Sequence, residues 1–175
     1  MKVLIVVDMQ NDFIDGSLGT KEAVGIVDRV AEVMDSFDGA VICTRDTHFA
    51  DYLNTSEGRK LPVEHCIEGT KGHALQDTIQ KMAEKKQAVV MNKITFGAKN
   101  LPEEIEKLAG GVPEFIELVG LCTDICVISN SMLLKAFYPE VPISVDASAC
   151  AGVTPQSHKN ALEAMKMCQI DIVNE

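Results

Sequence analysis

Reactive side chains recur in this sequence just after short apolar runs that are typical of buried strands. They are Asp8, Asp46, His48, Lys93 and Cys126. Because the carboxyl ends of parallel strands lie along one edge of a sheet, where α/β proteins bind their ligands, we expect these side chains to form one site. Such a set offers a thiol nucleophile, a proton acceptor and metal ligands.

Cys126 lies in the stretch Leu118–Asn130, which reads LVGLCTDICVISN and predicts a strand, a tight turn and a helix. We expect Thr123 to be the N-cap of this helix, so that Cys126 lies in its first turn. Unpaired N–H groups and the helix dipole favour negative charge there, which favours the thiolate. The alternative is a buried cysteine that acts only as a small apolar residue.

Asp8 and Lys93 are the candidate acid–base groups. Asp8 closes an apolar run, so desolvation should raise its pKa and make it an acceptor for a thiol proton. Lys93 ends the run VVMNK, and a buried ammonium between a carboxylate and a thiol would hold both groups in place and favour their anionic forms. The alternatives are a cap or loop carboxylate for Asp8 and a solvated surface position for Lys93.

Asp46, His48 and His65 are candidate metal ligands. Carboxylate and imidazole ligands suit a divalent metal, Zn²⁺ first and Fe²⁺ or Mn²⁺ as alternatives, with water and substrate completing the coordination shell. The long connection from residue 45 to residue 72 carries all three and shows only a weak helical signal, and a loop of that length is usually functional. Either histidine could instead hydrogen-bond the loop backbone.

The elements that must position these residues alternate between strand and helix. Apolar runs predict strands at Val3–Val7, Ala40–Thr44, Ala88–Met91, Phe115–Val119, Ile143–Val145 and Ile170–Val173. Helical spacing predicts helices at Glu22–Phe37, Ala74–Glu84, Pro102–Leu108, Asp124–Phe137 and Pro155–Met167. The alternation predicts one domain over residues 1–175, a three-layer α/β/α sandwich with a six-stranded, mostly parallel sheet. In the common strand order 3-2-1-4-5-6, Asp8 lies beside the turn that carries Cys126.

Composition and charge exclude several classes of partner. The chain has 175 residues and a net charge of −10 with no cluster of Lys and Arg, so nucleic acid and anionic membranes are poor partners. The N-terminal apolar run is too short for a signal peptide or a membrane span, so we expect a cytoplasmic protein. Thiols stay reduced in that compartment, and the six cysteines are therefore expected to be free.

Five motifs together resemble the isochorismatase-like cysteine hydrolases, and among these the nicotinamidase/pyrazinamidase-like branch. They are VVDMQNDF around Asp8, TRDTH around Asp46, LPVEHCIEGT around His65, VMNKITF around Lys93 and GLCTDICV around Cys126. The resemblance runs from Val3 to about Val173. It implies a catalytic triad of Asp8, Lys93 and Cys126. It also implies an oxyanion hole made by the backbone N–H groups of Cys122 and Cys126, helped by a cis peptide bond before Cys122.

The same resemblance implies a metal held by Asp46, His48 and His65 that binds the pyridine nitrogen of the substrate in nicotinamidases. Two departures concern this part of the site. A fourth ligand often found in the loop after His48 is missing, and the polar residues noted nearby are Tyr52, Asn54 and Ser56. The aromatic residue that typically precedes the last histidine by three positions is Pro62 here, so a flat ring would lack a stacking surface.

The reaction expected from these residues is hydrolysis of a small amide through a thioester, with nicotinamide converted to nicotinate and ammonia as the leading case. The first alternative is the same triad acting on another small amide, ureide or N-carbamoyl compound. The second is a non-catalytic small-molecule binder or redox sensor on the same fold. The resemblance also implies a homo-oligomer. The few aromatic residues near the sheet edge are expected to wall the substrate pocket: Phe13, Tyr52 and Phe96.

Overall fold

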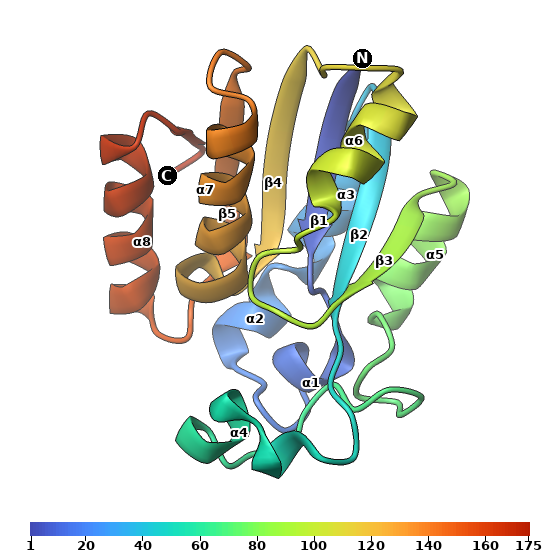
Figure 1. Ribbon diagram of the computed structural model, residues 1–175, viewed down its shortest axis with the longest axis vertical. Coiled ribbons are helices and arrows are strands. Elements are labelled where there is room, and N and C mark those ends of the chain that lie inside the picture. The colour runs from blue at the N-terminus through green and yellow to red at the C-terminus, as the bar shows by residue number, and fades with distance from the viewer.

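Strand β1 (Lys2–Val7) lies in the middle of a six-stranded parallel sheet in this computed structural model, which describes residues 1–175 (Figure 1). Residues Val3–Val7 are completely buried because helices cover both faces of the sheet at this strand. An unbroken apolar run is what such a strand requires. The strand order is β3-β2-β1-β4-β5-β6, which confirms the order expected from the sequence.

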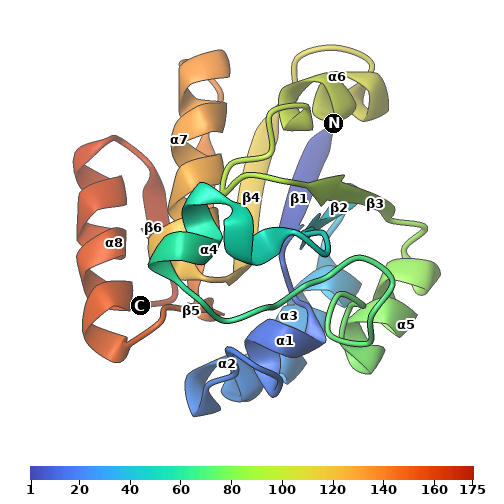
Figure 2. The same cartoon turned by 60° about the horizontal axis from the view of Figure 1, so that its bottom comes forward.

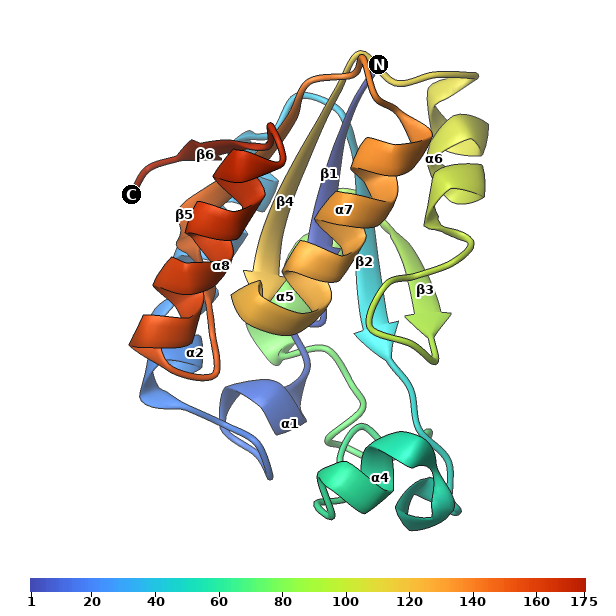
Figure 3. The ribbon, with the colours of Figure 1, turned by 60° about the vertical axis from the view of Figure 1, so that its left-hand side comes forward.

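The other strands are β2 (Ala40–Asp46), β3 (Val89–Lys93), β4 (Phe115–Leu121), β5 (Ile143–Ala151) and β6 (Asp171–Val173). One face of the sheet packs against α1 (Asn11–Ile14), α2 (Lys21–Gly25), α3 (Val27–Ser36) and α5 (Asp77–Lys85). The other face packs against α6 (Leu101–Ala109), α7 (Ile128–Phe137) and α8 (Pro155–Met167), of which α7 and α8 lie in front of the sheet in Figure 3. The result is the predicted three-layer sandwich. None of the helices combines the length and apolarity needed to cross a membrane.

Several predicted elements have different bounds in the structure. The predicted helix Glu22–Phe37 is interrupted at Ile26, which separates α2 from α3. The helix predicted from Ala74 begins only at Asp77, because the side chain of Gln76 caps the backbone N–H groups of the first turn. Strand β5 is much longer than the predicted strand, because its second half reads DASACA and small residues gave no apolar run. These differences leave the positions of the reactive side chains unchanged.

Strands β1 and β4 approach each other closely where Val7 pairs with Gly120. Gly120 has a φ of +114°, and a Cβ at this position would collide with the carbonyl oxygen of Val7. Glycine is therefore required here both for its backbone conformation and for the lack of a side chain. The contact places Asp8, the next residue after β1, beside the turn that follows β4.

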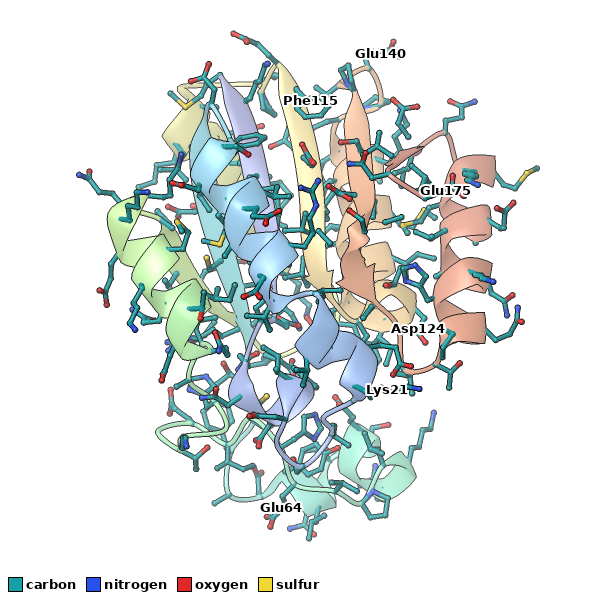
Figure 4. All side chains as sticks on the ribbon, turned by 180° about the vertical axis from the view of Figure 1, so that it is seen from behind. Lys21, Glu64, Phe115, Asp124, Glu140 and Glu175 are labelled. Carbon is teal, nitrogen blue, oxygen red and sulfur yellow. The ribbon has the colours of Figure 1, made fainter.

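The long connection between β2 and α5 covers the carboxyl ends of the strands. It contains a 3₁₀ turn (Tyr52–Asn54) and the short helix α4 (Ser56–Lys60). Figure 2 shows α4 lying across the ends of the central strands. In Figure 4, Glu64 and Asp124 are at this end of the molecule, whereas Phe115 and Glu140 mark the opposite end. The candidate site therefore lies between the strand ends and the long connection.

Candidate active site

The ammonium group of Lys93 is the centre of a buried group of reactive side chains. Its Nζ lies 2.7 Å from Asp8 Oδ2, 3.1 Å from Asp46 Oδ1 and 3.3 Å from Cys126 Sγ. All four residues are buried. The register of the sheet explains part of this arrangement, because Asp46 at the end of β2 pairs with Lys93 at the end of β3. We call Asp8, Lys93 and Cys126 the thiol cluster.

Asp8 is oriented by its neighbour strand. Its backbone N–H donates to the carbonyl oxygen of Thr44 at 3.2 Å, and Thr44 Oγ1 donates to Asp8 Oδ1 at 2.7 Å. The backbone of Asp8 has a φ of +48°, a region that aspartate tolerates better than most residues. One carboxylate oxygen is therefore occupied by Thr44, and the other faces Lys93.

Burial and the neighbouring charges set the protonation states of the thiol cluster. Burial raises the pKa of Asp8, with the positive charge of Lys93 opposing it. Burial alone would lower the pKa of Lys93, but the negative charges of Asp8 and Asp46 raise it, so the ammonium stays charged. Burial and the Asp8 carboxylate raise the pKa of Cys126 well above its usual value. The prediction of a thiolate from the position of Cys126 in the helix is therefore wrong. The resting group is a thiol, which needs the proton acceptor beside it.

The turn that carries Cys126 also differs from the prediction. The N-cap is Cys122, whose carbonyl oxygen accepts from the N–H groups of Ile125 and Val127 at 3.1 and 3.0 Å. The predicted N-cap, Thr123, is fully buried and hydrogen-bonds His158 Nδ1 at 2.7 Å instead. Cys126 lies in this widened first turn, Thr123–Val127, before α7 begins. The Leu121–Cys122 peptide bond is cis, and the backbone N–H of Cys122 forms no hydrogen bond within the protein.

The predicted metal ligands come together next to the thiol cluster, with a fourth that the sequence analysis missed. His48 Nε2 and His65 Nε2 each lie 3.6 Å from Glu57 Oε1. Asp46 Oδ2 lies 2.8 Å from His48 Nε2 and 3.7 Å from His65 Nε2. We call Asp46, His48, Glu57 and His65 the metal-ligand cluster. Glu57 is in the first turn of α4, which Thr55 caps through the N–H of Gly58.

The geometry of the metal-ligand cluster fits a divalent metal. All four ligand atoms lie within 4.8 Å of one another. Ligands about 2.1 Å from a tetrahedral metal are about 3.4 Å apart, close to most of the separations found here. His48 Nε2 is buried and faces the carboxylates of Asp46 and Glu57. His65 Nδ1 donates to the carbonyl oxygen of Val63 at 2.8 Å, which directs its Nε2 toward the cluster.

Both clusters open into one cavity of about 590 Å³. Cys126, Asp46, Glu57 and His65 contribute polar or reactive groups to its lining. Most of the remaining wall is apolar, from Phe13, Leu18, Leu61, Ile94, Phe96 and Val153. Two of the three aromatic residues expected in the pocket, Phe13 and Phe96, therefore line it.

Tyr52, the third, does not line this cavity. Its side chain is completely buried, and its hydroxyl donates to the carbonyl oxygen of Leu61 at 2.8 Å. The ring packs edge-on against His48 and His65, with centroid distances of 4.6 and 5.1 Å. Tyr52 therefore packs behind two of the candidate metal ligands, because the 3₁₀ turn points it inward.

Comparison with known proteins gives matches along the whole chain. An isochorismatase domain matches residues 2–174. The nicotinamidase/pyrazinamidase of Mycobacterium tuberculosis is 27% identical over 191 residues, covering 99% of this chain and 98% of that protein. The pyrazinamidase of Pyrococcus horikoshii in complex with zinc has a TM-score of 0.78 at 26% identity, covering 99% of both chains. The N-carbamoylsarcosine amidase of Thermoplasma acidophilum has a TM-score of 0.78 at 28% identity, covering 98% of this chain and 94% of that chain.

Proposed function

Because the chain belongs to the isochorismatase family and its relatives point to an amide hydrolase, we propose that it hydrolyses nicotinamide to nicotinate and ammonia through a thioester on Cys126. The observation that carries the proposal is the position of Lys93 Nζ, within 3.3 Å of the Cys126 sulfur and 2.7 Å of Asp8. A nucleophile, a proton acceptor and a fixed cation thus meet at the wall of one cavity.

The first half of the reaction uses the thiol cluster. Asp8 accepts the proton of the Cys126 thiol, and the sulfur attacks the amide carbonyl carbon. The backbone N–H groups of Cys122 and Cys126 hold the negative charge that develops on the carbonyl oxygen, and one such donor is worth about 3 kcal/mol. Asp8 then returns its proton to the amide nitrogen, the C–N bond breaks, and ammonia leaves a thioester.

The second half regenerates the enzyme. Asp8, again ionised, takes a proton from a water molecule that attacks the thioester carbonyl. The C–S bond breaks, the sulfur recovers the proton, and the carboxylic acid product leaves. Lys93 stays charged throughout, because Asp46 is anionic and the thiol cluster carries one further negative charge, on Asp8 or on the sulfur, and it keeps both groups in place. The net change is one amide and one water giving one carboxylic acid and one ammonia.

The metal-ligand cluster supports nicotinamide as the substrate. Asp46, His48, Glu57 and His65 would hold a divalent metal, zinc first and Fe²⁺ or Mn²⁺ as alternatives. A metal held there supplies a Lewis acid for the ring nitrogen of a pyridine carboxamide. The zinc complex of the Pyrococcus horikoshii pyrazinamidase supports this assignment.

The proposal is tested by the release of ammonia from nicotinamide. The wild-type protein loaded with zinc should release ammonia, and the Cys126→Ala variant should lose at least about a thousandfold in kcat, as expected when a nucleophile is removed. Mass spectrometry of an acid-quenched reaction should show the acyl group on the Cys126 peptide. Turnover that is unchanged in the variant would rule out the thioester route.

A second candidate is the same chemistry on another small amide, ureide or N-carbamoyl compound. The similarity to an N-carbamoylsarcosine amidase supports it, and so does a cavity whose volume lies within the range of about 300–1,000 Å³ that also holds drug-sized ligands. A panel of amides assayed with and without a chelator separates the two candidates. A substrate outside the pyridine carboxamides that is faster and metal-independent would favour the second.

We also propose a cellular location, the classes of partner and an oligomeric state for the protein. The six free cysteines support a cytoplasmic location, where thiols stay reduced. The net charge of −10 argues against nucleic acid and anionic membranes as partners. A homo-oligomer is the expectation from the resemblance, and light scattering of the purified protein tests it.

A further inference from the structure

Asn130 is a fully buried polar residue that the reaction above does not use. It lies on α7, one helical turn after Cys126. A buried amide is costly unless it is hydrogen-bonded. The hydrogen bonds of Asn130 should therefore show what role its side-chain amide has at this position.

The Asn130 amide joins the nucleophile to one wall of the cavity. Its Nδ2 donates to the carbonyl oxygen of Cys126 at 2.8 Å and to that of Phe96 at 3.3 Å. Its Oδ1 accepts from the backbone N–H of Ala98 at 2.8 Å. One side chain thus holds the backbone of Cys126 and two points of the loop that follows Lys93.

The first part of this loop, Ile94–Phe96, lines the cavity, and we call it the wall segment. In Figure 1 the loop between β3 and α6 crosses the lower edge of the sheet toward the start of α7. Its other hydrogen bonds are local: Thr95 Oγ1 donates to Gly97, and the carbonyl oxygen of Ala98 accepts from Leu101. Ile94 and Phe96 are 65% and 46% exposed, so packing alone holds them weakly.

We propose that Asn130 is a positioning residue that fixes the wall segment at a set distance from the Cys126 sulfur, and thereby sets the fit of the substrate acyl group. The proposal rests on the proposed function, because it takes Cys126 as the nucleophile. Asn130 itself touches no reacting atom. Its loss should impair the fit of the substrate more than the reactivity of the thiol.

The test compares Asn130→Leu with Ser131→Ala. Ser131 is also fully buried, and its Oγ donates to the carbonyl oxygen of Val127 at 2.8 Å, but it makes no bond to the wall segment. For Asn130→Leu we expect KM for nicotinamide to rise about tenfold with kcat within about threefold of wild type, the scale of one or two lost hydrogen bonds. Ser131→Ala should leave both constants unchanged. An equal loss in the two variants, or a lower melting temperature with unchanged KM, would overturn the proposal.

A second readout needs no turnover. The rates at which iodoacetamide and the bulkier 2-iodo-N-phenylacetamide alkylate Cys126 are measured by mass spectrometry of the Cys126 peptide. Asn130→Leu should change the ratio of the two rates at least about fivefold while the iodoacetamide rate stays near wild type. A constant ratio would overturn the proposal. If wild type released no ammonia from any amide, the proposed function would fail, but the ratio would still test the wall.

If Asn130→Leu does not fold, Asn130→Asp provides the same comparison. Aspartate keeps the size and the acceptor for the Ala98 N–H, but loses the donor to Cys126 and Phe96. The expected changes in KM and in the alkylation ratio have the same direction. Wild-type values for both quantities in this variant would show that the donated bonds do not position the wall.

Discussion

The thiol cluster and the metal-ligand cluster are neighbours at one edge of the sheet, but different parts of the chain build them. Asp8 and Lys93 are fixed by the ends of β1 and β3, and Cys126 lies in the turn after β4. In the metal-ligand cluster, Glu57 and His65 come from the long connection after β2. Parallel-strand hydrogen bonds therefore hold one cluster, whereas the other depends on loop contacts.

Asp46 contacts both clusters. Its Oδ1 lies 3.1 Å from Lys93 Nζ, and its Oδ2 lies 2.8 Å from His48 Nε2. Desolvated charges, which are costly to misplace, are thus held by the sheet. Ligands that a bound metal can draw into position are held by a loop. Variants that affect one cluster at a time should separate their contributions.

The largest effect should follow loss of the cation in the thiol cluster. Lys93→Met should lower kcat/KM at least about a hundredfold. Lys93 lowers the pKa of Asp8, so its removal raises that pKa further. Because Asp8 accepts a proton only when ionised, activity should be lost at a higher pH on acidification than in wild type. The measurement is kcat/KM as a function of pH.

Lys60→Met is the matched control for this variant. Lys60 also lines the cavity, but it is solvent-exposed and forms no ion pair. Its removal should leave the acidic limb of the profile in place. If the limb of Lys93→Met coincided with that of wild type, the electrostatic coupling between Lys93 and Asp8 would be absent.

An intermediate effect should follow loss of the ligand on α4. Glu57→Gln removes a charged donor, so zinc affinity should fall about ten- to a hundredfold in a competition titration with a chromophoric chelator. Alkylation of Cys126 by iodoacetamide should keep its wild-type rate. Glu64→Gln, an exposed position in the same connection, is the control and should bind zinc like wild type. Equal zinc affinity in the three proteins would remove Glu57 from the cluster.

The smallest effect is expected at Cys122. Its side chain is a half-buried thiol whose pKa is raised to about 12 by desolvation, so it is protonated at neutral pH. Only its backbone N–H is assigned to the oxyanion hole, and Cys122→Ala retains that group. Activity should therefore stay within about threefold of wild type in a steady-state ammonia assay. A loss as large as that of Cys126→Ala would mean that the thiol itself takes part.

The sheet order and the three residues of the thiol cluster could be predicted because Asp8 and Lys93 close apolar runs and Cys126 stands in the turn that follows one. Glu57 could not, since it stands in a connection where neither a strand end nor a helical period indicates which side chains meet. The available signal was local. Thr55 with Glu57 two residues later is typical of a capped helix start, and the structure shows that cap.

The protonation state of Cys126 was predicted wrongly for a physical reason. The position in the first turn indicated a thiolate, but burial and Asp8 raise the pKa of this thiol more than Lys93 lowers it. The sequence gives no measure of depth below the surface. Tyr52 shows the same limit. Its position near the site was predicted correctly, but its ring points behind the metal-ligand cluster and not into the cavity.

The strand order has a consequence for how the site appears as the chain is made. Asp8, Lys93 and all four metal ligands belong to residues 1–93, which emerge first and form β1, β2 and β3. Cys126 emerges later with β4, which must pair with β1 across a long stretch of sequence. Pairings between distant segments form slowly. We therefore expect the cysteine to acquire its proton acceptor only when β4 pairs with β1.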